Sequence, residues 1–154
     1  LQNEGAIETA AQLRVPVCLM HMQGSPQTMQ ENPHYDDVVV DIMAFFKERI
    51  KACEVAGIDK ERIILDPGFG FGKTLDQNVV LLNQLDAICE LDSPVLVGLS
   101  RKSMLGMILD RPVAERLIAS VVAAVIAYNR GARLFRVHDV AATYDALRIC
   151  AVFK

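Results

Sequence analysis

The chain has 154 residues, of which 52% are hydrophobic and 23% charged, and 16 basic residues against 19 acidic ones give a formal net charge of −3. So high an apolar fraction with so small a net charge excludes a disordered protein, and the lack of a basic excess argues against a nucleic-acid partner bound by bulk charge. The longest apolar run, residues 117–128, is shorter than the roughly 18 residues of a membrane-spanning helix, so no membrane partner is expected.

The N-terminus and the cysteines bear on where the protein works. Residues 1–5 are polar and contain no basic residue, which predicts the absence of a signal peptide. The first residue is Leu rather than Met, which predicts a processed, trimmed or partial chain. The four cysteines, at positions 18, 53, 89 and 150, lie in apolar stretches and form no Cys-x-x-Cys pair. This pattern predicts buried, reduced thiols in a cytoplasmic protein.

The first part of the chain alternates short apolar runs with amphipathic ones. Residues 4–13 predict a helix, residues 15–20 a buried strand, and the polar residues 22–35 a long loop. Residues 36–56 predict a second helix, which ends at Gly57. Apolar residues recur in it with a helical period, at Val39, Ile42, Met43, Phe46, Ile50 and Cys53.

The second part of the chain repeats the alternation three times. Short apolar runs predict strands at residues 62–65, 94–99 and 133–137. The segments that follow them predict helices at residues 75–91, 113–130 and 141–152. The apolar face of the first of these helices is expected to consist of Val79, Leu82, Leu85 and Ile88.

One helix followed by four strand–helix units predicts an α/β fold with parallel strands. The segments between the strands are long enough for crossover helices, and near-continuous apolar runs suit strands that are covered on both faces. The length suits one domain. Four strands make either a small open sheet or half of an eight-stranded (β/α)8 barrel.

Polar side chains follow each of the four predicted strands directly. They are His21, Asp66, the run Ser-Arg-Lys-Ser at residues 100–103, and the run Arg-Val-His-Asp at residues 136–139. The carboxyl ends of parallel strands face the same side of an α/β fold, where ligands bind. We therefore expect one shared pocket that contains a carboxylate, several cations and an imidazole.

Asp66 opens a glycine-rich loop, Pro-Gly-Phe-Gly-Phe-Gly-Lys, at residues 67–73. Glycines allow unusual backbone dihedral angles or a close approach to a ligand. We interpret Asp66 as a carboxylate that binds a donor-rich ring, with a phenylalanine on the ring face; the alternative is a turn with a capping aspartate. A nucleotide-binding P-loop is excluded, because only three residues separate Gly68 from Gly72 and that motif has four.

Cations gather after the third and fourth predicted strands. Residues 100–103 lie at a strand-to-helix turn, where free N–H groups favour an anion and cations are otherwise unfavourable. Arg136 and His138 are two residues apart and are expected to share one face of their strand, which suits a phosphate or pyrophosphate. The sequence shows neither metal-ligand spacing nor a Ser-His-Asp order typical of acyl transfer.

Four motifs at these strand ends resemble dihydropteroate synthase, the sulfonamide-sensitive enzyme of folate biosynthesis. They are LMHMQG at residues 19–24, LDPGFGFGK at 65–73, VGLSRKS at 97–103 and RVHD at 136–139, in the family's order and spacing. The family fold is a (β/α)8 TIM barrel. The resemblance covers essentially the whole chain and implies that residues 1–154 form a single partial domain, strands five to eight of a pterin-binding barrel, with one helix before four parallel βα units.

The resemblance also implies a transferase reaction and its residues. The family condenses p-aminobenzoate with 6-hydroxymethyl-7,8-dihydropterin pyrophosphate and releases pyrophosphate. Asp66 would bind the pterin ring, Lys102 would bridge the pterin and p-aminobenzoate sites, and Ser103 would bind the p-aminobenzoate carboxylate. Arg136 and His138 would hold the pyrophosphate and, with Lys102, are the expected catalytic residues. The other expected substrate-binding residues are Met20 and Phe71, which would line the pocket, Gly98, which would give the ring room, and Gly70, Ser100 and Arg101.

Some family features fall outside this sequence. The family's first four strands carry the Asn that helps to hold magnesium and pyrophosphate, a mobile Ser-Thr-Arg-Pro loop, and an Asp and an Asn that bind the pterin. The resemblance therefore implies Mg²⁺ as a cofactor but no metal ligand in this chain, and it leaves the activity of the chain alone open. The family dimerises through late helices, and residues 113–128 are apolar nearly all round, so a homodimer is expected.

Three other interpretations compete with this one. A methyltetrahydrofolate methyltransferase domain is a neighbouring pterin-binding barrel, but residues 100–103 argue against it because a methyl donor needs no p-aminobenzoate pocket. A truncated barrel that binds pterin without turnover is the second, and measurable binding without product would distinguish it. A flavodoxin-like open sheet that binds another phosphorylated ligand is the third, and only the count of four strands supports it.

Overall fold

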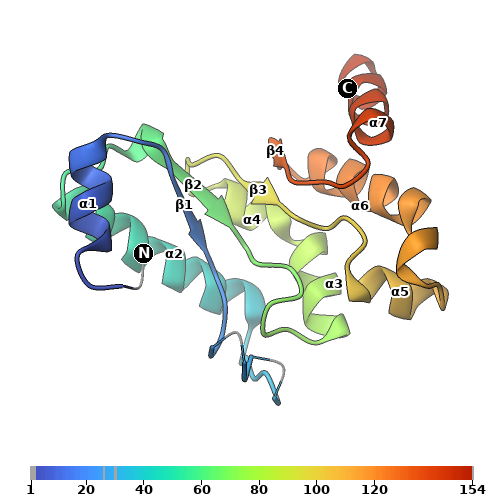
Figure 1. Ribbon diagram of the computed structural model, residues 1–154, viewed down its shortest axis with the longest axis horizontal. Helices are drawn as coiled ribbons and strands as arrows, with labels where there is room; N and C mark the ends of the chain where they lie inside the picture. Colours follow the sequence, from blue (N-terminus) through green and yellow to red (C-terminus); the bar gives the residue numbers. More distant parts are fainter. Residues whose placement is uncertain (1–2, 26, 30, 154) are drawn as a thin grey trace.

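The computed structural model describes residues 3–25, 27–29 and 31–153 (Figure 1). Each strand of the described chain is followed by one or more helices, as the sequence predicts in outline. The elements are α1 (Ala6–Leu13), β1 (Val17–Met20), α2 (Val38–Val55), the 3-10 helix η1 (Lys60–Arg62), β2 (Ile63–Asp66), α3 (Leu75–Asn83), α4 (Leu85–Cys89), β3 (Leu96–Val97), α5 (Ser103–Leu109), the 3-10 helix η2 (Val113–Glu115), α6 (Leu117–Asn129), β4 (Leu134–Phe135) and α7 (Val140–Val152).

The four strands form a parallel row in chain order. β1 pairs with β2 in a register that places Met20 opposite Asp66, and β3 pairs with β4. An isolated parallel bridge between Leu65 and Val95 joins the two pairs. The helices follow the row in the same order, from α2 beside β1 to α7 at the C-terminal end (Figure 1). The predicted parallel α/β arrangement is therefore confirmed for the described residues.

The two faces of the strand row differ in burial because side chains alternate along a strand. One face packs against the helices and is almost completely buried, with Val17, Leu19, Ile63, Leu65, Val95 and Val97 in the core. The other face, which we call the open strand face, consists of Cys18, Met20, Ile64, Leu96 and Leu134, all half-buried or exposed. The prediction of four buried thiols is wrong for Cys18, which lies on this face; Cys53 is buried, and all four thiols are free.

Helix α2 follows the predicted pattern closely. The Asp37 carboxylate caps its first turn by accepting hydrogen bonds from the N–H groups of Val39 (2.9 Å) and Val40 (3.1 Å). The helix ends before Gly57, whose φ of +87° suits a residue without a side chain. Its core face contains every residue that the helical period predicts, with Met43 half-buried and the others buried.

The helix predicted at residues 75–91 is two helices that meet at Gln84. The break lets α3 bury Leu81 and Leu82 while α4 buries Leu85 and Ile88. The predicted face is wrong for Val79, which is 38% exposed. Because the helical backbone is interrupted at Gln84 (φ −115°, ψ 27°), the residues of α3 and α4 do not form one continuous helical face.

The strands at residues 94–99 and 133–137 and the helix at 113–130 are shorter than predicted. The chain leaves β3 at Gly98 to enter α5, so β4 has no partner beyond the bond from the Arg136 N–H to the Val97 carbonyl (3.0 Å). Arg136 and His138 therefore follow the strand instead of sharing its face. At residues 113–130 the first turn is the 3-10 helix η2, and α6 begins at Leu117.

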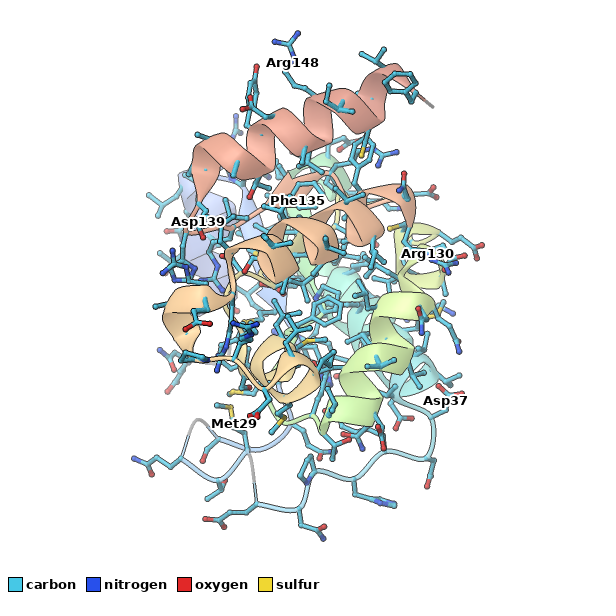
Figure 2. All side chains as sticks on the ribbon, turned by 90° about the vertical axis from the view of Figure 1, so that its right-hand side faces the viewer. Met29, Asp37, Arg130, Phe135, Asp139 and Arg148 are labelled. Atoms are coloured by element: carbon cyan, nitrogen blue, oxygen red, sulfur yellow. The ribbon has the colours of Figure 1, made fainter. Side chains whose placement is uncertain are left out.

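The predicted loop at residues 22–35 folds back on the glycine-rich loop; its residues 26 and 30 lie outside the described residues. The Gln23 side chain donates to the His34 carbonyl (2.6 Å) and accepts from the His34 N–H (2.9 Å). The Tyr35 hydroxyl donates to the Gly72 carbonyl (2.7 Å). Met29 of this loop lies on the opposite side of the molecule from Arg148 of α7 (Figure 2).

Within the described residues, no helix combines the length and the apolar character needed to cross a membrane.

Candidate functional site

The site residues lie where the four strands end, as predicted. Met20 is the last residue of β1 and Asp66 the last residue of β2, and the two are paired in the strand register. Asp66 is buried, and its carboxylate accepts a hydrogen bond from the Gly68 N–H (2.8 Å). Burial raises the pKa of Asp66, while the Gly68 N–H and the charge of Arg136 oppose that rise. A buried acceptor of this kind can bind a ligand that supplies N–H donors.

The glycine-rich loop after Asp66 passes very close to the end of β1. Gly68 has a φ of +68°, and a Cβ atom there would stand 1.9 Å from the carbonyl oxygen of His21. Gly70 has a φ of +77°, and a Cβ atom there would stand 3.3 Å from Cδ of Lys102. The Gly70 N–H donates to the side chain of buried Asn78 (2.8 Å). The loop is thus fixed from both sides, and only glycine fits at Gly68.

Lys102 covers the tip of this loop. Its ammonium donates to the Phe69 carbonyl (2.6 Å) and lies 4.0 Å from the centre of the Phe71 ring. Burial lowers the pKa of Lys102, the Arg136 charge lowers it further, and Asp66 acts against both. Lys102, Phe71 and Asp66, predicted from three separate motif positions, therefore meet at one place.

Arg136 reaches this place from the opposite end of the strand row. A Cβ atom on Gly98 would stand 2.8 Å from Nη2 of Arg136, so the missing side chain of Gly98 leaves space for the guanidinium. The charge of Arg136 lowers the pKa of Asp66, of Lys102 and of Cys18, and Cys18 lies on the open strand face. The predicted role of Gly98 in making room for a ring stays a prediction.

Ser100 connects the end of β3 to His138. The Ser100 hydroxyl is buried, lies 2.9 Å from Nδ1 of His138 and accepts a hydrogen bond from the His138 N–H (3.1 Å). The imidazole is thereby oriented by a neighbouring strand end. Ser100 and His138, both predicted as binding residues, are therefore brought together.

Arg101 is held by contacts with Ser120 and Asp139. Its φ is +57°, and its N–H donates to the hydroxyl of Ser120 in α6 (2.9 Å). Its guanidinium makes two hydrogen bonds to the carboxylate of Asp139 (3.1 and 2.7 Å), where the chain enters α7 (Figure 2). These bonds and the positive charge hold the pKa of Asp139 below its usual range. In this structure Arg101 joins two strand ends.

Ser103 begins α5, directly after Lys102 at the N-cap position. Ser103 is exposed, and the Lys102 side chain makes no capping bond. The turn that presents it is held from α6, because Arg116 donates to the carbonyls of Arg101 (3.1 Å) and Lys102 (3.4 Å). The predicted strand-to-helix turn is thus present, and the p-aminobenzoate role of Ser103 stays a prediction.

Sequence reasoning missed the pairing of Lys73 with His21. Lys73 is buried, and its ammonium lies 3.1 Å from Nδ1 of His21. Burial lowers the pKa of Lys73 to about 7 and that of His21 to about 4. A signal was present: Thr74 begins a capping box with Gln77, and a lysine directly before a helix start is unfavourable unless another part of the fold needs it.

The described residues fit a magnesium ion poorly. They contain no group of three or more His, Cys, Asp or Glu side chains placed to hold a metal. The positive charges of Arg136, Lys102 and Lys73 act on Asp66, the carboxylate of the site, and they disfavour the binding of a magnesium ion there.

Comparison with known proteins supports the resemblance. The family model for pterin binding enzymes matches residues 2–138. Dihydropteroate synthase of Haemophilus influenzae is 54% identical over 149 residues, covering 97% of this chain and 54% of the relative. The structure of Yersinia pestis dihydropteroate synthase with a sulfonamide drug complex superposes with a TM-score of 0.97 at 50% identity, covering 99% of this chain and 56% of that chain. Xanthomonas albilineans dihydropteroate synthase in complex with 7,8-dihydropteroate gives 0.91 at 51% identity, covering 99% and 56%.

The chain spans about half the length of the curated relatives it matches. The match to the family model nevertheless covers most of the chain and includes every strand end of the site. The chain therefore belongs to the pterin-binding enzyme family.

Proposed function

We propose that this chain is the C-terminal half of a dihydropteroate synthase barrel, strands five to eight, and provides its ring-binding and pyrophosphate-binding groups. The meeting of Asp66, Lys102 and Phe71 at the strand ends is the observation that carries this proposal. Four parallel strands in chain order and a half-exposed apolar strand face support the half-barrel, because a closed barrel would bury that face. The longer relatives, named dihydropteroate synthase, support the activity.

The pterin ring is assigned to the space beside Asp66. Its carboxylate would accept hydrogen bonds from ring and exocyclic N–H groups, a charge-assisted interaction. Phe71 and Met20 would contact the ring, and the Lys102 ammonium would lie between the ring and p-aminobenzoate. Ser103 would bind the p-aminobenzoate carboxylate, and a sulfonamide would compete there; the complexes named for the Yersinia pestis and Xanthomonas albilineans enzymes support this.

The pyrophosphate is assigned to Arg136 and His138. The guanidinium lies beside Gly98, and the imidazole is oriented by Ser100. In the reaction, the bond from the pterin methylene carbon to the pyrophosphate oxygen breaks, and the oxygen keeps the electron pair. The amine nitrogen of p-aminobenzoate forms the new bond to that carbon and loses a proton. Fixed cations stabilise the charge that develops on the leaving group, and the pocket positions the amine.

Two further expectations join this proposal. Magnesium stays a prediction from the family resemblance, and its ligands are not assigned to this chain. A cytoplasmic location is supported by the four cysteines, which are all free thiols. Cys18 is exposed, Cys89 and Cys150 are half-buried, and Cys53 is buried.

Replacing Asp66 by Asn is the test of the ring assignment. We expect the dissociation constant for the dihydropterin pyrophosphate, measured by titration calorimetry on the 154-residue chain, to rise about tenfold or more, because a hydrogen bond to a charged group is worth about 1.5–3 kcal/mol. Asp86→Asn, on the exposed side of α4, is the matched control and should leave binding unchanged. Equal affinity in the wild type and Asp66→Asn would make Asp66 a structural cap. Binding without product would indicate a half-barrel that binds but does not catalyse.

We also propose a homodimer through the outer face of the late helices. A groove of about 740 Å³ lies between α3, α5 and α6. It is lined by apolar side chains, several of them exposed, including Ile108, Ile118 and Val122. Ile118→Glu is expected to shift the chain from dimer to monomer in sedimentation velocity, whereas Val55→Glu, at the exposed last residue of α2, should not. A single-chain mass over a wide concentration range for the wild type would contradict the dimer.

A further inference from the structure

Lys73 connects the end of β1 to the glycine-rich loop. Its ammonium donates to the carbonyls of Gly68 (3.0 Å) and Phe71 (3.0 Å), which flank the tip of the loop, and lies 3.1 Å from Nδ1 of His21. An ammonium has three protons, so these three acceptors satisfy it completely. Burial keeps His21 neutral at neutral pH by lowering its pKa to about 4, which leaves Nδ1 able to accept.

The loop that Lys73 holds carries two parts of the ring pocket. Gly68 donates its N–H to the Asp66 carboxylate, and the Phe71 ring lies under the Lys102 ammonium. Lys73 therefore binds the carbonyl of the residue that orients Asp66 and the carbonyl of the residue that faces the ring. Lys73 is 3% exposed and does not face solvent, so it is not itself placed to bind substrate.

The charge of Lys73 also acts on the pocket. The charges of Asp66 and Lys102 act on the pKa of Lys73, and His21 is the titratable group in contact with its ammonium. Lys73 lowers the pKa of Asp66, together with Arg136 and Lys102. In a buried site such an interaction is screened much less than at the surface.

We propose that Lys73 is a positioning residue of the ring pocket, which fixes the loop between Gly68 and Phe71 and thereby the Gly68 N–H that binds the Asp66 carboxylate. The functional consequence rests on the proposed pterin site; the effect on Asp66 does not.

The direction of the pH effect follows from the Lys73 ammonium. Burial lowers the pKa of Lys73 to about 7, so the ammonium is present below that pH and lost above it. Ring binding should therefore weaken as the pH rises through neutrality. Lys102 also has a lowered pKa and sits closer to the ring, so the contribution of Lys73 has to be separated by substitution.

The first test measures Asp66 directly, without a ligand. The carboxyl carbon of Asp66 is titrated by NMR in the wild type, Lys73→Met, Lys73→Arg and Tyr35→Phe. We expect Lys73→Met to raise the pKa of Asp66, because a nearby positive charge is lost and the Gly68 N–H is no longer held in place, and Lys73→Arg to restore it. Tyr35→Phe removes a neutral hydrogen bond to the same loop, at Gly72, and should leave the pKa of Asp66 unchanged. An Asp66 pKa in Lys73→Met equal to that of the wild type overturns the proposal.

The second test measures ring binding with the dihydropterin alcohol, a probe without the titrating pyrophosphate. We expect Lys73→Met to bind it about tenfold more weakly at pH about 6, and the loss of wild-type affinity between pH about 6 and about 8.5 to shrink in Lys73→Arg, whose charge persists. If the wild type binds the dihydropterin alcohol and Lys73→Met binds it with the same affinity, the positioning role is refuted and the pterin site is not. No binding by the wild type would refute the pterin site, and the Asp66 titration would still decide the role of Lys73.

If Lys73→Met does not fold, the wild type provides the answer. The carbonyl-carbon signals of Gly68 and Phe71 should then titrate together with the side-chain carbon next to the Lys73 nitrogen, because the ammonium binds both carbonyl groups. Carbonyl signals that do not change across the Lys73 titration would rule the proposal out.

Discussion

Replacing Gly68 by Ala is expected to reduce the free energy of unfolding by about 2–4 kcal/mol, because overpacking against a fixed backbone adds to the cost of a left-handed conformation. The new Cβ atom would stand 1.9 Å from the His21 carbonyl oxygen, and the φ of Gly68 is +68°. The end of β1 or the loop has to move, which also displaces the Gly68 N–H from Asp66. Urea unfolding at neutral pH measures the effect.

Gly57→Ala is the control for backbone strain alone. Gly57 has a φ of +87°, and a Cβ atom there would meet nothing within 4 Å. It should cost about 1 kcal/mol. If the two variants lose the same stability, the close approach of Gly68 to β1 contributes nothing, and the packing of the glycine-rich loop described above is wrong.

Acid is expected to destabilise the fold through His21. The pKa of its imidazole is about 4 in the folded chain, against an ordinary value of 6.5 for histidine. Between these two values the unfolded chain binds a proton that the folded chain does not, so stability rises with pH across this window and is lost as the pH falls through it. The loss between pH about 7 and about 4 should approach 3 kcal/mol. The raised pKa of Asp66 acts in the opposite direction and offsets part of it.

A pair of histidine variants isolates this effect. His21→Gln should flatten the dependence of the urea midpoint on pH between about 4 and about 6.5, because the titrating group is gone. His34→Gln, whose side chain is 84% exposed, should leave the dependence as in the wild type. A wild-type stability that stays constant across this window would show that His21 does not remain neutral next to Lys73.

Local periodicity in the sequence determined most of the secondary structure. The apolar spacing of α2 gave its core face, and Gly57 gave its end, because a helix must bury one stripe and stop where a left-handed residue is available. The polar residues after the apolar runs gave the position of the site, since parallel strands all end on one side. Asp66, Lys102 and Arg136 could be named for this reason.

The tertiary structure alone decided which of these side chains interact. Arg101 binds Asp139, 38 residues away, and Arg136 fills the space above Gly98. Lys73 reaches His21 across 52 residues of chain. The tertiary structure also made β3 and β4 shorter than predicted and divided the helix predicted at residues 75–91 into two. Sequence patterns predict the burial of each residue separately. The partner of a buried charge depends on how elements that lie far apart in the chain pack against each other, so it is decided only in the folded structure.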